Sequence, residues 1–156
     1  MIHLTRQNIK AFQQEIVRGA YKVRLLLLRE LTILLEELIN EAQENGNYKN
    51  RTGNLRSSIG GVVLDNGKPF QQVGFAPVAG TESGESGVTD GKKFLESIIR
   101  THKNGIVVIV VAGRKYGVYV QKYYGYNVLL SAETLCSVKI PQIELRIQKV
   151  LNKVRT

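Results

Sequence analysis

The sequence predicts an α+β fold, in which a long N-terminal helix and several shorter helices pack on a small, mostly antiparallel β-sheet. Two observations carry this prediction. Apolar residues keep a helical spacing through the first forty positions, and after residue 60 short β-branched runs are separated by turn signals. A chain of 156 residues has the length of one ordinary domain, so we expect a single domain over residues 1–156.

The first helix is expected from Thr5 to about Glu44. If unbroken it would be roughly 60 Å long, longer than a body of this size would cover, so it must break, project or pack on another subunit. Gly19 is the expected place for a bend. The apolar surface widens around residues 25–35, which indicates burial on two sides. The residues that set the helical spacing are Ile9, Phe12, Ile16, Ala20, Val23, Leu27, Leu31, Leu34 and Leu38.

The next segment, residues 50–60, predicts a short connector helix. Thr52 can cap it through its hydroxyl group. Leu55 and Ile59, four positions apart, give the helix one apolar edge that docks on the body. The side chain of Arg56 is expected to stay in solvent.

A hairpin is expected next, with strands at 62–64 and 70–75. The turn between them contains Asn66 and Gly67, which tolerate the positive φ angles of a tight hairpin. Residues 79–91 hold four glycines and few large apolar side chains, so we expect a flexible loop there.

Asp90 is placed to cap a helix from about Lys92 to Thr101. The uninterrupted β-branched run 106–111 then predicts a central strand that is covered on both faces. After it we expect a short helix over 116–124 and a helix or extended arm over 128–136. Pro141 is expected to begin the last helix.

The chain carries a formal net charge of +9, and eight basic against two acidic side chains follow residue 105. Such a balance favours contact with nucleic acid or with the acidic face of a protein partner. The last helix places basic residues on one side, and we take them as candidates to face a polyanion. They are Arg146, Lys149, Lys153 and Arg155.

The sequence offers few groups for catalysis or metal binding. Cys136 is the single cysteine, and the two histidines, His3 and His102, are far apart in the chain, so neither a disulfide framework nor a usual zinc site is expected. The two aspartates, Asp65 and Asp90, fall at turn or cap positions. We therefore expect no enzymatic activity, cofactor or metal. No apolar run approaches 18 residues, so we also expect no membrane contact and a protein that is soluble when made.

Tyrosines gather with basic residues after the β-branched run, at Tyr116, Tyr119, Tyr123 and Tyr124. Aromatic and basic residues in this mixture can stack bases and hold phosphates. Tyrosine is also enriched at protein interfaces, and the rings could equally pack on the sheet. The sequence leaves these alternatives open.

Two segments resemble a known family. The run Thr-Gly-Asn-Leu-Arg-Ser-Ser-Ile at 52–59 is similar to the "T-G-N-L-R-x-S-I" signature of the neck or tail-completion proteins of long-tailed bacteriophages, which also follows a long helix. The run 116–120, then Tyr123-Tyr124-Gly125 and 129–132, is similar to the family's second pattern, although Gln121 stands where the family has glutamate. Residues 79–105 look like an insertion.

The resemblance implies a structural virion protein that forms a ring of six or twelve copies at the head-tail junction or tail top. Such a ring joins the connector or adaptor proteins to the tail tube, close to DNA in the channel, after assembly in the host cytoplasm. We expect the first helix and the tyrosine segment at subunit contacts, with the 79–91 loop ordering on a neighbour. The alternative is a basic nucleic-acid-binding module that uses the last helix and the tyrosines. The candidate interface residues are Thr52, Gly53, Asn54, Leu55, Arg56, Tyr116, Tyr119, Tyr123 and Tyr124.

Overall fold

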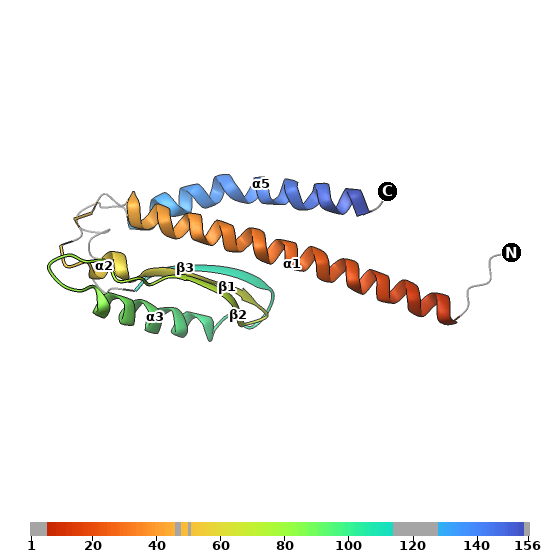
Figure 1. The fold of residues 1–156 in the computed structure, drawn as a ribbon, viewed down its shortest axis with the longest axis horizontal. Helices are drawn as coiled ribbons and strands as arrows, with labels where there is room; N and C mark the ends of the chain where they lie inside the picture. Colours follow the sequence, from red (N-terminus) through yellow and green to blue (C-terminus); the bar gives the residue numbers. More distant parts are fainter. Residues whose placement is uncertain (1–5, 46–47, 50, 114–127, 155–156) are drawn as a thin grey trace.

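The fold has helices on both faces of a small sheet (Figure 1). The computed structural model describes residues 6–45, 48–49, 51–113 and 128–154. Helix α1 (Arg6–Glu44) lies over one face of a three-stranded sheet, α5 (Leu130–Val154) packs on the side of α1 away from the sheet, and α3 (Glu85–Ile99) covers the other face. The predicted α+β class is confirmed. The predicted helix over 116–124 lies outside the described residues.

The sheet is antiparallel throughout, with strand order β2-β1-β3. Its strands are β1 (Ile59–Asp65), β2 (Lys68–Gly74) and β3 (Ile106–Ala112). The predicted hairpin is confirmed, because Asn66 (φ 51°) and Gly67 (φ 77°) both take the positive angles of a tight two-residue turn.

The position predicted for the β-branched run is wrong in one respect, since β3 is an edge strand and β1 is the central one. The run is nevertheless covered on both faces. Val108 and Val110 pack toward the cluster of α1 and α5, whereas Ile109 and Val111 belong to the cluster under α3. Two-sided cover explains an uninterrupted apolar strand without requiring a central position.

Helix α1 runs for 39 residues and continues through Gly19, so of the three expected outcomes the helix projects and does not break at the position where a bend was expected. The predicted burial on two sides is confirmed. One side faces the sheet, where Leu35 lies against Gly61 of β1. The other side is held to α5 by ion pairs from Glu30 and Glu37. The widened apolar surface is therefore covered by another helix of the same chain.

Helix α3 begins at Glu85, seven residues before the predicted start, so the predicted loop is wrong for residues 85–91. The glycines there permit close packing against α2 (Asn54–Ser57) and β1. A Cβ on Gly91 would lie 2.6 Å from the carbonyl oxygen of Ser58, and one on Gly87 would lie well under 3.0 Å from that of Asn54.

Pro141 lies inside α5 and does not begin a new helix, so this prediction is also wrong. Proline removes one backbone hydrogen bond from a helix interior. Pro141 and Ser137, whose carbonyl group loses that donor, are both exposed, so water can bond to the oxygen. The chain from Leu130 onward can therefore form one helix along α1.

Replacing the two helical glycines Gly87 and Gly19 should have opposite effects. Gly87→Ala should lower the free energy of unfolding by about 1–3 kcal/mol, because the methyl group overpacks the α2–α3 contact. At Gly19 the position of a Cβ meets no described atom within 4 Å other than its own helix. Gly19→Ala should therefore raise the free energy by up to about 1 kcal/mol in the dilute protein. Urea unfolding followed by circular dichroism measures both, and equal effects would contradict the packing described.

Candidate docking surface

The N-terminal part of α1 extends beyond the helix that packs on it. Lys139 Nζ lies 2.9 Å from Glu37, and Arg146, seven residues further along α5, lies 2.9 Å from Glu30, seven residues back along α1. The helices are therefore antiparallel, and at this register the last residue of α5 comes level with Lys22. Residues 6–22, which we call the α1 arm, project for about 25 Å, as Figure 1 shows.

The α1 arm exposes large apolar side chains. Phe12 is 66% exposed and Tyr21 is 65% exposed, although both are aromatic. Five such side chains lie within 17 residues, and exposed apolar surface of this extent is typical of an interaction site on a soluble protein. They are Ile9, Phe12, Ile16, Val17 and Tyr21.

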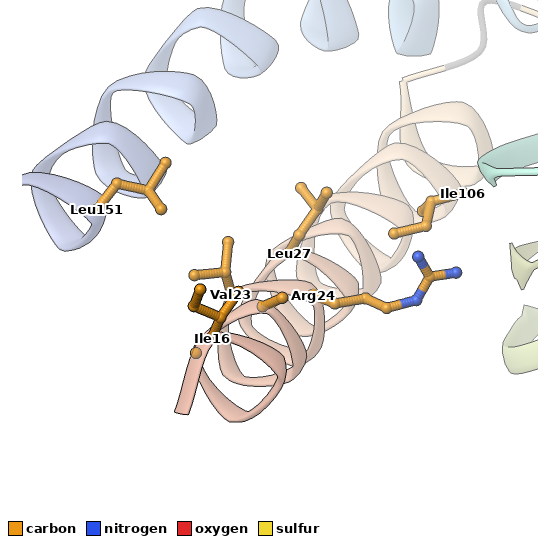
Figure 2. A pocket seen from close by; sticks show the side chains of 8 residues that line it. Ile16, Val23, Arg24, Leu27, Ile106 and Leu151 are labelled. Carbon is orange, nitrogen blue, oxygen red and sulfur yellow. The ribbon is translucent and has the colours of Figure 1, made fainter. Parts of the chain in front are cut away.

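A groove runs along the base of the arm, between the end of α5 and the start of β3 (Figure 2). It has a volume of about 500 Å³. Leu151 of α5 and Ile106 of β3 stand on its two sides. Its floor is formed by α1 residues on one side of the helix. They are Ile16, Gly19, Ala20, Val23 and Leu27.

One charged pair lies at the edge of this groove. Arg24 donates hydrogen bonds from Nε and Nη2 to the carboxylate of Asp65 at the end of β1, with Nε 3.2 Å from Oδ2. This hydrogen bonding lowers the pKa of Asp65 below its ordinary value and raises the pKa of Arg24. The pair fastens the middle of α1 to the hairpin, so the arm begins from a fixed point.

Three of the candidate interface residues are packed inside this chain. Gly53, Asn54 and Leu55 are all buried. The Asn54 side chain donates to the Glu82 carboxylate and accepts from Ser86 Oγ and from the backbone N–H of residue 87 at 3.1 Å. These bonds tie α2 to the start of α3. A contact of this segment with a neighbouring subunit stays a prediction.

The remaining two residues of this segment are partly exposed. The N-cap residue of α2 is Gly53, and no side chain makes a cap hydrogen bond, so the prediction that Thr52 caps the helix is wrong. Thr52 Oγ1 instead accepts a hydrogen bond from the backbone N–H of Asn54, two residues on, at 3.3 Å. The guanidinium of Arg56 lies over the Tyr48 ring, 5.7 Å from its centre, and its Nε is buried. The expectation that Arg56 stays in solvent is therefore wrong. Burial also raises the pKa of Tyr48.

The other candidate residues fall into two groups. Tyr116, Tyr119, Tyr123, Tyr124 and Arg155 lie outside the described residues. Among the basic residues of α5, Arg146 is engaged by Glu30 and Lys153 also has an interaction partner, while Lys149 is exposed. The basic side of α5 is therefore partly occupied by contacts within the chain.

Groups for metal chemistry do not converge in the part of the chain described. Among those residues no cluster of three or more His, Cys, Asp or Glu side chains could hold a metal ion. Cys136 packs half-buried against the α1–α5 core. His102 Nδ1 lies 3.0 Å from the carbonyl oxygen of Ile98 at the C-terminal end of α3, near the helix end that the sequence predicted. Within the described ranges, no helix has the length and apolar character needed to cross a membrane.

Sequence reasoning missed the hydrogen bonds of Asn54 and the groove beside Gly19. The hydrogen-bonding role of Asn54 is indicated by the sequence, because an asparagine next to a glycine often bonds to nearby backbone groups. The partners at 82–87 could not be foreseen while that region was interpreted as a loop. The groove depends on where α5 ends relative to α1, and periodicity does not carry that information.

No protein-family model, curated protein or solved structure matches the chain. The similarity of residues 52–59 to the tail-completion signature therefore rests on the motif itself.

The Arg24–Asp65 pair predicts a pH-dependent contribution to stability. Because the folded-state pKa of Asp65 is lowered, the contribution is present above the ordinary carboxyl pKa of about 3.9 and is lost as the pH falls through the lower folded value. Asp65→Asn should therefore be less stable than the parent protein at pH 7, and the two should converge in strong acid. Urea unfolding at several pH values measures this. The exposed Glu36→Gln is the matched control, and a difference for Asp65→Asn that persists in acid would contradict the assignment.

Proposed function

We propose that this chain is a structural virion protein of a tailed phage, which assembles as a ring at the head-tail junction or tail top and joins the connector to the tail tube. The assembly role is supported by one observation above the others, the projecting α1 arm with its exposed apolar side chains. The phage setting is supported by the similarity of residues 52–59 to the family signature.

The α1 arm supports an assembly role because an uncovered helix with exposed apolar side chains is unfavourable in an isolated chain. An isolated helix of this length is marginal in water, and helices in proteins are stabilised chiefly by packing of an apolar face. Phe12 and Ile16 are more than half exposed within the chain. A contact with another chain would remove these side chains from water and stabilise the helix at the same time.

The segment that carries the family signature supports a rigid attachment point. Ser57 Oγ accepts from the backbone N–H of Val78 at 2.7 Å and donates to the carbonyl oxygen of Gly53 at 2.8 Å. Together with the bonds of Asn54, it fixes α2 and the chain before α3. Thr52 and Arg56 are the side chains of the signature that a neighbour in the ring could reach.

The nucleic-acid-binding alternative is less well supported. It requires a continuous basic side on α5, yet Arg146 lies 2.9 Å from a Glu30 carboxylate oxygen. Basic residues near a genome channel are compatible with either function, so the two must be separated by experiment.

The proposed function predicts that the purified protein forms closed oligomers. Size-exclusion chromatography with light scattering should give the mass of six or twelve chains at high concentration. Deleting residues 1–20 should lower the mass of the assembly, because the exposed apolar side chains of the arm are lost, while the remaining chain keeps its sheet and α5, since residues 6–20 lie beyond the end of α5. Circular dichroism provides the control for folding.

A monomer at every concentration, absent from virions of the parent phage, would contradict the proposal. A salt titration of DNA binding tests the alternative. Tight binding that weakens steeply with salt and is lost in a Lys149→Ala, Lys153→Ala double variant would favour the nucleic-acid-binding module.

A further inference from the structure

Three of the five exposed apolar residues of the α1 arm, Ile9, Phe12 and Ile16, begin the spacing of a coiled-coil seam, which the partly buried Gly19 and Val23 continue. Residues 9, 12, 16, 19 and 23 are separated by steps of three, four, three and four, which places them at successive a and d positions. Val23, at the end of this seam, lines the groove opposite Leu151 of α5 (Figure 2). The seam is therefore the continuation of the side of α1 on which α5 packs.

Gly19 is the exception in this seam. A glycine in a helix interior costs about 1 kcal/mol relative to alanine unless its small size serves a close contact. Within the described chain no such contact is seen, because no atom outside its own helix lies within 4 Å of its Cβ position. The missing side chain leaves a notch in the floor of the groove that a side chain from another molecule can fill.

We propose that the occupant of this seam is the α1 arm of a second copy, which lies antiparallel to the first across a two-fold axis. Each arm then covers the other. In an antiparallel pair, a positions pack against d positions, so Ile9 enters the notch at Gly19 of the partner copy and Phe12 packs on Ile16 of the partner copy. The inference rests on the assembly role proposed for α1 and names the partner at that site.

The direction and length of the part of α1 that α5 leaves uncovered favour the arm of a second copy as the occupant. Helix α5 runs antiparallel to α1 and ends level with Lys22. In the pairing proposed, the arm of the partner copy runs in the same direction as α5, and its first helical residue, Arg6, comes level with Lys22. The two segments therefore cover α1 end to end without overlapping. Residues 6–22 are the part of α1 that α5 leaves uncovered, and residues 6–22 of the partner copy have the length needed to cover them.

The charges of the arm argue against an acidic protein or a lipid surface as the occupant. The arm carries four basic residues and Glu15, but its basic residues all fall outside the a and d positions of the seam. Lys10 and Arg18 are exposed and lie on the side of the helix away from Phe12 and Ile16, by the helical period. The partner at the seam is therefore selected by apolar shape, with the charges left in water.

The contact area sets the expected affinity. An aromatic side chain presents about 150–250 Å², and each copy contributes one, Phe12, beside smaller aliphatic side chains, so the interface lies near the small end of the range for specific interfaces. We expect a dissociation constant on the order of micromolar, as for weak, transient contacts. Because the two arms have the same net charge, added salt should strengthen the pair. Binding to DNA, anionic lipid or an acidic protein would instead weaken with salt.

The pairing is compatible with the proposed ring. A two-fold contact closes between two copies, whereas a ring requires a head-to-tail contact elsewhere on the surface. Two six-fold rings joined by such pairs would contain twelve chains with dihedral symmetry and identical ends, so the pairing describes the free protein, before one end of a ring joins the connector and the other end the tail tube.

Replacing Phe12 tests the seam against a matched residue on the same helix. Phe12→Ser should raise the dissociation constant of the pair at least about tenfold. Tyr21→Ser, equally exposed at 65% against 66%, lies outside the seam and should change it less than about twofold. Gly19→Leu should block the notch and also weaken the pair, with helicity unchanged by circular dichroism. Analytical ultracentrifugation from about 1 to about 200 μM, at low and high salt, measures the constants. Equal effects of Phe12→Ser and Tyr21→Ser, or association that weakens with salt, would overturn the inference.

Cysteine cross-linking tests direction and register. In a Cys136→Ala background, Phe12→Cys and Ile16→Cys variants are mixed and oxidised with oxidised glutathione. Antiparallel pairing predicts that the mixed disulfide predominates, because residues 12 and 16 of opposite copies face each other. If disulfides between two copies of the same variant predominate, residue 12 faces residue 12 and residue 16 faces residue 16. This result would indicate parallel pairing and overturn the inference. Rings that form without the mixed disulfide would leave the proposed function standing, and a cross-linked dimer without rings would leave the pairing standing.

Discussion

The structure depends on a mismatch in length between α1 and everything that packs on it. Helix α1 has 39 residues, α5 has 25 and the strands have seven, which correspond to about 60, 38 and 24 Å. The sheet and α5 can therefore cover only the C-terminal part of α1. The apolar face of α1 nevertheless continues to Ile9. The same face that forms the core beyond Leu27 becomes a docking surface before Lys22, with no change in its pattern.

The body that carries this helix is rigid where backbones come close together. Gly87 and Gly91 let α3 approach α2 and β1, and the Asn54 side chain satisfies backbone and side-chain groups of α3 across that contact. The segment similar to the tail-completion signature thus has a clear role inside the chain. Arg24 and Asp65 connect this body to α1 at the point where the arm begins.

Much of this fold could be predicted from the sequence because local rules determine it. The period of α1 and the Asn66-Gly67 turn are set by neighbouring residues. The errors arose where tertiary contacts reverse a local preference: glycines at 87 and 91 indicated a loop, and Pro141 indicated a helix start. The candidate site was predictable only in part. The apolar residues of the arm are visible in the sequence, but which of them lack cover depends on where α5 ends.

Hydrogen exchange measured on the α1 arm tests most directly the claim that a second molecule covers it. The backbone amides of residues 6–22 should exchange rapidly in dilute protein and at least about tenfold more slowly at high concentration, whereas those of α3, which is covered within the chain, should not change. Mass spectrometry of peptic peptides resolves the two regions. Equal exchange of the arm at both concentrations would show that the arm stays uncovered and would contradict this account.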